Sequence, residues 1–210
     1  MTQKTIHIVR HGQTDFNKHK IVQGSGVNSS LNETGRKQAN AFFQKYQNIG
    51  FEVVLTSKLV RTHETMAPFI QQGLSWEQFG EIDEMSWGAH EGKQSNPAMI
   101  EEYRWMIEQW KSGNYQVGIS GGETALDLAK RIQTFVDHLK QRPEEKILVC
   151  SHGRAMRCLM ALLRQEELLH MEQYHHSNTG LYLVDYQPDE FTFQLKNDTS
   201  HFLLDPSLTN

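Results

Sequence analysis

IHIVRHGQTDFN (residues 6–17) places an arginine and a histidine side by side at the point where an apolar run ends. Residues 5–9 are mostly β-branched, which is typical of a short strand that is buried on both faces. A strand of that kind belongs to a parallel sheet with helices on either side. Arg10 and His11 would then stand just past its carboxyl end, where Gly12 opens a loop.

A later stretch repeats this arrangement. The strand predicted over Lys146–Ser151 is followed by His152 and Gly153, and a helix is predicted over 154–163. Further strands are predicted over residues 51–56, 76–82, 180–185 and 191–196, and further helices over 37–46, 59–71, 97–111 and 124–139. The last two strands would form an antiparallel hairpin around a turn at 187–189. This order predicts an α/β fold, a three-layer sandwich with a mainly parallel central sheet flanked by helices.

The composition is that of a soluble globular protein with one domain over residues 1–210, because 38% hydrophobic residues in a chain of this length are enough for one core. A net charge of −4 gives no general attraction to nucleic acid or to an anionic membrane, so we expect neither as a partner. The chain has no apolar run near the roughly 18 residues of a membrane span and no signal-peptide core. Two cysteines without CxxC spacing fit a reducing compartment, and we expect a cytoplasmic protein.

Basic side chains follow three of the predicted strands at their carboxyl ends. Arg10 and His11 follow the first, Arg61 comes shortly after the second, and His152 follows the strand at 146–151. Because the carboxyl ends of parallel strands meet at one edge of a sheet, these side chains are expected to converge. Such groups repel one another unless they bind an anion, and a phosphoryl group has the charge and the oxygens to satisfy them.

A histidine in a phosphate pocket can do more than bind. One ring nitrogen can attack phosphorus while the other is fixed by a hydrogen bond, which gives a phosphohistidine that water then hydrolyses. Arginines and a second, protonated histidine would hold the equatorial oxygens as Mg²⁺ does in kinases, so no metal or other cofactor is expected. A partly desolvated carboxyl group would protonate the leaving alkoxide. Glu84 is well placed for this, with Asp83 and Glu81 as alternatives.

Four blocks of the sequence, taken together, resemble the histidine phosphatase superfamily, also called the phosphoglycerate mutase-like family. In chain order they are VRHGQTDFN (9–17), SKLVRT (57–62), DEMSWGAHEG (83–92) and SHG (151–153). The resemblance covers most of the domain and implies a phosphoglycerate mutase-like fold. It also implies that His11 is the phosphorylated nucleophile, that Glu84 is the acid, and that Asn17 binds phosphate.

The predicted site can now be stated in full. The expected catalytic residues are His11, Glu84, Arg10, Arg61 and His152. The expected substrate-binding residues are Asn17, Gln23, Gly24 and Gly153, of which Gly153 begins a helix whose N–H groups point at the phosphate. No metal ligand is expected. The pair His175-His176, with His170 nearby, lacks the carboxylate or cysteine companions and the i, i+4 spacing of a convincing metal site.

The segment between Glu84 and Ser120 favours one branch of the family. Phosphoglycerate mutases carry a longer insertion there that encloses the intermediate and returns its phosphate, whereas a shorter cover leaves room for water. We therefore expect a metal-independent phosphomonoesterase, a histidine acid phosphatase-type phosphoric monoester hydrolase, with residues 93–120 as its substrate-covering segment. Its partner would be a small phosphorylated metabolite.

Two alternatives stay open on the sequence. One is a phosphoglycerate mutase-type phosphotransferase, and the other is a protein that binds a phosphorylated ligand without turning it over. A pure binder needs neither a nucleophile nor an acid, and His11 and Glu84 are both present. The phosphate motifs select the phosphoryl group and leave the alcohol open, and the sequence specifies no oligomeric state.

Overall fold

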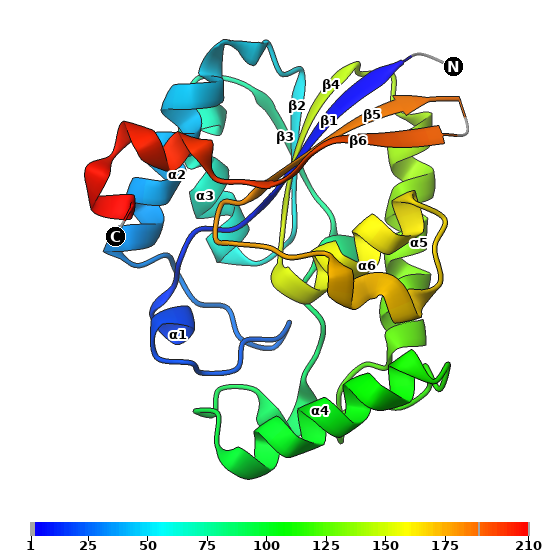
Figure 1. The fold of residues 1–210 in the computed structure, drawn as a ribbon. Coiled ribbons are helices and arrows are strands. Elements are labelled where there is room, and N and C mark those ends of the chain that lie inside the picture. Colours follow the sequence, from blue (N-terminus) through cyan, green and yellow to red (C-terminus); the bar gives the residue numbers. More distant parts are fainter. Residues whose placement is uncertain (1–2, 189, 210) are drawn as a thin grey trace.

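A sheet of parallel and antiparallel strands forms the centre of the computed structural model, which describes residues 3–188 and 190–209 (Figure 1). Within those residues the strands are β1 (Lys4–Arg10), β2 (Val53–Thr56), β3 (Ser75–Gln78), β4 (Lys146–Ser151), β5 (Leu181–Gln187) and β6 (Glu190–Asp198). Their order across the sheet is β3-β2-β4-β1-β5-β6. The first four strands run parallel, and β5 and β6 run antiparallel to their neighbours.

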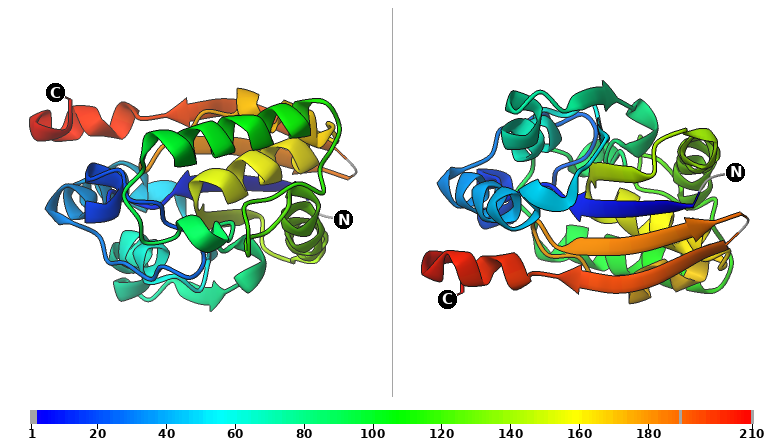
Figure 2. Two further views of the ribbon diagram at one scale, coloured as in Figure 1. Left: turned by 90° about the horizontal axis from the view of Figure 1, so that it is seen from below. Right: turned by 90° about the horizontal axis from the view of Figure 1, so that it is seen from above.

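Helices cover both faces of this sheet (Figure 2). The α-helices are α1 (Asp15–Lys18), α2 (Glu33–Tyr46), α3 (Val60–Gln71), α4 (Pro97–Lys111), α5 (Ala125–Gln141) and α6 (Gly153–Leu163). Short 3-10 helices lie at Gln47–Ile49, Gly80–Ile82, Gly88–His90, Leu168–Gln173, Ser200–Leu204 and Pro206–Leu208. The pair α2 and α3 packs on one face, and α5 and α6 pack on the other. The α/β sandwich predicted from the sequence is therefore confirmed.

Both faces of the central strands are buried, as their continuous apolar runs predict. In β1, Ile6 and Ile8 join the core beneath α5 and α6, while Val9 joins the core beneath α2 and α3. The helices α1 and α4 lie beyond the carboxyl ends of the parallel strands, outside this stack (Figures 1 and 2). Across residues 3–188 and 190–209, every helix is too short or too polar to span a lipid bilayer.

The structure differs most from the sequence-based expectation at two boundaries. The strand expected over 76–82 ends at Gln78, because β3 is an edge strand that pairs with only the four residues of β2, and residues 80–82 form a 3-10 helix. The helix expected from Lys37 begins at Glu33, where the Asn32 side chain caps it. The β5–β6 hairpin is present, and the turn expected at 187–189 includes Asp189, which lies outside the described residues.

Buried histidines make the stability of this fold depend on pH. Burial lowers the pKa of His7 in β1 to about 4, against a smaller opposing effect of Asp185, and burial likewise lowers the pKa of His201 to about 4. The unfolded chain binds these protons more readily, since an unperturbed histidine has a pKa near about 6.5. These two histidines therefore cost the fold no stability above pH 6.5, and they lower its free energy of unfolding progressively as the pH falls toward 4.

We expect the urea midpoint to fall steadily between pH 6.5 and pH 4.5, and His7→Phe to make that fall shallower. Phenylalanine keeps the edge contact of the ring with Phe51, at 4.9 Å between centroids, and removes the titrating group. His19→Gln, at an exposed histidine, is the control and should leave the slope unchanged. A slope in His7→Phe equal to that of the wild type would contradict the assignment to His7.

Candidate active site

His11 lies directly past the end of β1, with its side chain 3% exposed. Its Nδ1 is 2.7 Å from the carbonyl oxygen of Gly12. Because a carbonyl only accepts, Nδ1 carries the proton and Nε2 keeps its lone pair. Burial, helped by the positive charges of Arg61 and Arg10, holds the pKa of His11 well below its ordinary value. The imidazole is therefore neutral and is oriented with one ring nitrogen available for reaction.

Arg61 and His152 form a fully buried pair beside this histidine. The Nε of Arg61, in the first turn of α3, donates to Nδ1 of His152 at 3.1 Å. The His152 ring, whose centroid lies 5.1 Å from that of His11, then carries its proton on Nε2, which donates to the Ser57 hydroxyl at 2.7 Å. Burial and Arg61 hold the pKa of His152 well below its usual range. The expectation of a protonated second histidine is thus wrong for this structure, because a buried arginine disfavours another positive charge next to it.

The guanidinium of Arg10, near His11 and Arg61, has hydrogen-bond donors that are not all used within the described residues. One of its terminal nitrogens lies 3.5 Å from the backbone oxygen of His176, and its buried Nε has no hydrogen-bond partner in the part of the chain that the structure describes. Burial lowers the pKa of Arg10 to about 10, with Glu84 opposing the shift and Arg61 adding to it. The group remains charged at neutral pH. A buried cation with an unused donor is a position at which an anion would be bound.

Glu84 reaches the cluster from a loop instead of from a strand end, because β3 stops early. Its carboxylate accepts from the backbone N–H groups of Met85 at 2.8 Å and of Arg154 and Ala155 at 3.1 Å. The last two belong to the first turn of α6, so the carboxylate sits at the positive end of that helix. A Cβ atom on Gly153 would lie 2.8 Å from the His176 ring and 3.5 Å from Glu84 Oε2, which explains glycine at this position.

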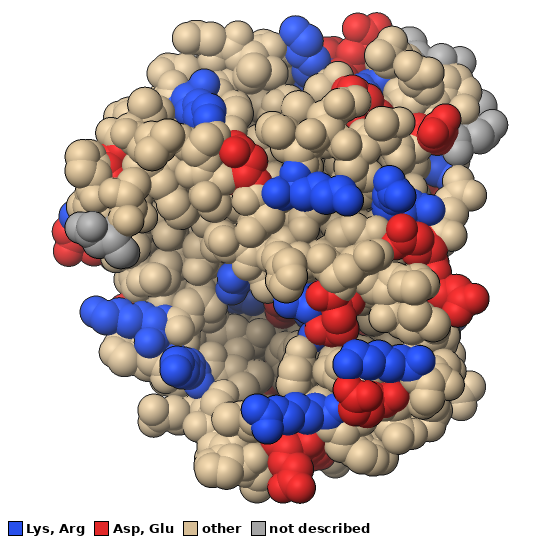
Figure 3. Space-filling model, viewed as in Figure 1, with Lys and Arg blue, Asp and Glu red and all other residues tan. Residues whose placement is uncertain are grey.

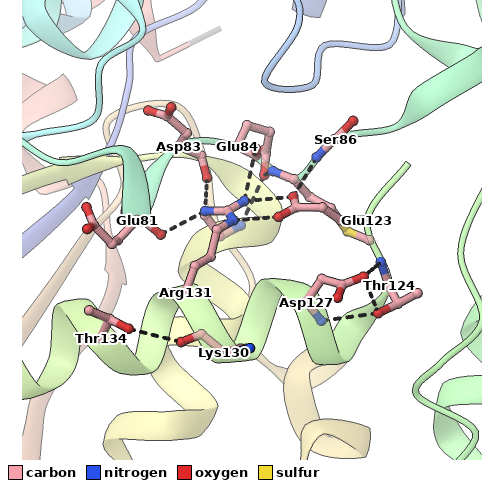
Figure 4. Close-up of polar contacts among 12 residues, drawn as sticks. Glu81, Asp83, Glu84, Ser86, Glu123, Thr124, Asp127, Lys130, Arg131 and Thr134 are labelled. Carbon is pink, nitrogen blue, oxygen red and sulfur yellow. Dashed lines mark hydrogen bonds and ion pairs between the residues drawn. The ribbon is translucent and has the colours of Figure 1, made fainter. Parts of the chain in front are cut away.

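Arg131 of α5 holds the segment that carries Glu84 (Figure 4). It donates to the backbone carbonyls of Glu81 at 2.7 Å, Asp83 at 2.8 Å and Glu84 at 3.1 Å. Its charge is paired with Glu123 at 2.7 Å, just before α5. Sequence reasoning missed Arg131 and Glu123, since an arginine on an amphipathic helix has the same pattern whether it faces solvent or a loop.

The other predicted binding residues lie in the loop between β1 and α2. The hydroxyl of Thr14 caps α1 by accepting from the backbone N–H of Asn17, and it also accepts from Nε2 of Gln23 at 2.8 Å. The Thr14 hydroxyl therefore ties Asn17 and Gln23 together. Gly24 packs so closely on Glu91 that a Cβ atom would lie 1.9 Å from the carboxylate, and its carbonyl accepts from Arg61 at 3.4 Å.

Two further residues of the site come from the segment before β5. The side-chain amide of Asn178 donates to the backbone oxygen of His11 at 2.9 Å and to Oδ1 of Asn17 at 3.3 Å. His176 accepts from Arg157 at 3.1 Å, and burial, Arg10 and Arg157 lower its pKa to about 3. A signal for both exists only once the strand order is known, because an antiparallel strand begins at the same edge at which its neighbour β1 ends.

The pair His175-His176 is a candidate metal site by residue type alone. Within residues 3–188 and 190–209, no group of three or more histidine, cysteine, aspartate or glutamate side chains is arranged to hold a metal ion. His176 instead contacts the arginines of the site.

The chain resembles known proteins in sequence and in structure. A model of the histidine phosphatase superfamily (branch 1) matches residues 6–199. A probable phosphoglycerate mutase GpmB of Yersinia pestis (strain Pestoides F) is 28% identical over 203 residues, which are 93% of this chain and 94% of that protein. The alpha-ribazole phosphatase from Shigella flexneri superimposes with a TM-score of 0.81 at 22% identity, over 93% of this chain and 96% of that one. A mutant phosphoserine phosphatase from Entamoeba histolytica, in complex with phosphoserine, superimposes with a TM-score of 0.80 at 22% identity, over 94% of this chain and 98% of that one.

Proposed function

This chain belongs to the histidine phosphatase superfamily, branch 1, and on that premise we propose that it is a metal-independent phosphomonoesterase of the histidine acid phosphatase type that hydrolyses a small phosphorylated metabolite. One observation carries the proposal. His152 uses both ring nitrogens in hydrogen bonds, whereas His11 uses only Nδ1 among the described residues. His11 is thus the histidine whose Nε2 lone pair can attack phosphorus.

In the first step the phosphoryl oxygens are held by Arg10, Arg61 and Asn17, and by His152 once its Nε2 proton turns from the Ser57 hydroxyl to the substrate. Nε2 of His11 attacks phosphorus, the bond from phosphorus to the alcohol oxygen breaks, and Glu84 gives a proton to the departing oxygen. The charge that builds up on the equatorial oxygens is met by donors that are already in place, which is where fixed side chains lower a barrier most.

In the second step water attacks the phosphohistidine. Glu84, now ionised, accepts a proton from that water, the nitrogen–phosphorus bond breaks, and inorganic phosphate leaves with His11 neutral again. Residues 93–120, with α4 lying across the carboxyl ends of the strands, are proposed to cover the alcohol end of the substrate (Figure 2).

A phosphoglycerate mutase is the second candidate, because a relative at 28% identity bears that name. A mutase keeps the phosphoryl group on the enzyme and returns it to another oxygen of the same substrate, so it must exclude water from the intermediate. The compared solved structures bear the names of phosphatases, which agrees with hydrolysis.

The test is phosphate release from a panel of phosphomonoesters, including 3-phosphoglycerate, with and without EDTA, together with rapid quenching to detect acid-labile, protein-bound phosphate. We expect release at a rate that EDTA leaves unchanged, with labelled protein present during turnover. Interconversion of phosphoglycerates without net release would identify a mutase. Binding of an ester without either reaction would identify a phospho-ligand-binding protein.

A further inference from the structure

A cavity of about 300 Å³ lies beside the proposed phosphate site, and among the residues that the structure describes its lining holds no lysine, arginine, aspartate or glutamate. Its apolar lining comes from Val22, Trp87, Met99, Ile100 and Tyr103. Gln23, His90 and Ser95 complete it. The space-filling view, drawn from the same side as Figure 1, shows a hollow between the positions of α1 and α4, with lysine and arginine side chains along its rim (Figure 3).

Two of the segments that line the cavity also deliver residues of the phosphate site. Gln23 stands in its wall and bonds to Thr14, the residue that caps the helix carrying Asn17. Trp87 comes three residues after Glu84, and its backbone N–H donates to the Glu91 carboxylate at 2.8 Å. A substrate whose phosphoryl group lies between Asn17 and Glu84 would therefore place its alcohol part in this cavity.

The arginine next to the aromatic lining, Arg154, is already paired with a carboxylate. The Arg154 guanidinium lies 5.9 Å from the Trp87 ring and 5.7 Å from the Tyr103 ring, and it forms an ion pair with Glu172. His90 is engaged by Glu102 at 2.8 Å. A carboxylate placed in the cavity would lose its hydration and would meet no unpaired lysine or arginine among the described lining residues, which is unfavourable. An uncharged ring or alkyl group would instead bury apolar surface against Trp87 and Tyr103.

We propose that this cavity selects phosphate monoesters whose alcohol part is uncharged and largely apolar, and that it discriminates against acidic ones such as phosphoglycerates. The inference rests on the proposed phosphatase function and names the substrate class of that site. It also assigns a specificity role to α4, which contributes Met99, Ile100 and Tyr103.

Phosphonates, which cannot be hydrolysed, separate binding from turnover. Calorimetry would compare methylphosphonate, 2-phenylethylphosphonate and 2-carboxyethylphosphonate, and phosphate release would compare 2-phenylethyl phosphate with 3-phosphoglycerate. We expect the phenylethyl compound to bind at least about tenfold more tightly than the methyl compound. The carboxyethyl compound should bind no more tightly than methylphosphonate. Of the two esters, 2-phenylethyl phosphate should have a higher kcat/KM than 3-phosphoglycerate.

The chain offers a matched pair of variants for this test. Ile100 lines the cavity and Leu126 on α5 does not, and both are 41% exposed. Ile100→Gln should lower the affinity ratio of phenylethyl to methyl phosphonate by about three- to tenfold, whereas Leu126→Gln should leave it unchanged. Ser95→Phe, which fills the cavity from an exposed position, should lower the ratio as well.

The outcomes separate the two proposals. Hydrolysis of the esters together with equal affinity for the three phosphonates, or equal effects of Ile100→Gln and Leu126→Gln on the ratio, overturns the inference and leaves the phosphatase standing. Tighter binding of the carboxyethyl compound overturns it too and favours the mutase. If the protein neither binds any of the phosphonates nor releases phosphate from any ester, both the inference and the proposed phosphatase function are overturned.

Discussion

Replacing His11 with alanine is expected to lower phosphate release by at least about 10⁴-fold, the scale seen when a covalent nucleophile is removed, and to abolish the acid-labile phosphate on the protein. The reason is positional. His11 is the histidine whose Nδ1 is fixed by a carbonyl, which leaves Nε2 with its lone pair, and whose ring lies near the charged Arg61 and Arg10. Stopped assays with a ³²P-labelled ester would follow both quantities on the same samples.

The control for this substitution is His7→Phe, at a buried histidine within β1. It should retain both turnover and labelling, because His7 lies in the middle of β1, where its ring packs against Phe51 and not against the residues of the site. Labelled phosphate that persists in His11→Ala would sink the assignment and would point to His152 as the nucleophile.

The strand ends could be predicted because each obeys a local rule. Apolar runs at β1, β2 and β4 end at Arg10, Thr56 and Ser151, and parallel strands share an edge. That rule gathers the histidines and arginines without any knowledge of side-chain packing, and the resemblance to a family assigned their expected roles.

The supporting residues needed information that the sequence does not carry locally. The contact of Asn178 with the backbone of His11 depends on β5 lying antiparallel beside β1, which neither strand specifies alone. Arg131 has the same helical spacing as a solvated charge, yet its guanidinium bonds three carbonyls of a loop. The neutrality of His152 follows from burial next to Arg61, and burial emerges only from packing.

Replacing Glu84 with glutamine should slow the first step in a way that depends on the leaving group. For an alkyl phosphate we expect a loss of about 10²- to 10⁴-fold in the phosphorylation rate, the usual contribution of a general acid. For p-nitrophenyl phosphate the loss should be far smaller, since nitrophenolate departs without a proton. The glutamine oxygen can take the place of Oε1 and keep the N–H groups of Met85 and Ala155 bonded, so the loop should hold its shape.

Rapid mixing with p-nitrophenyl phosphate gives the sharpest form of this test. If Glu84 also accepts the proton of the attacking water, the variant should release one equivalent of nitrophenol in a burst and then turn over slowly, with phosphohistidine accumulating. Asp83→Asn is the matched control, because the Asp83 carboxylate bonds the backbone of Lys58 at 2.8 Å instead of the start of α6. A leaving-group-dependent loss in Asp83→Asn, together with an unchanged first step in Glu84→Gln, would transfer the role of the acid to Asp83.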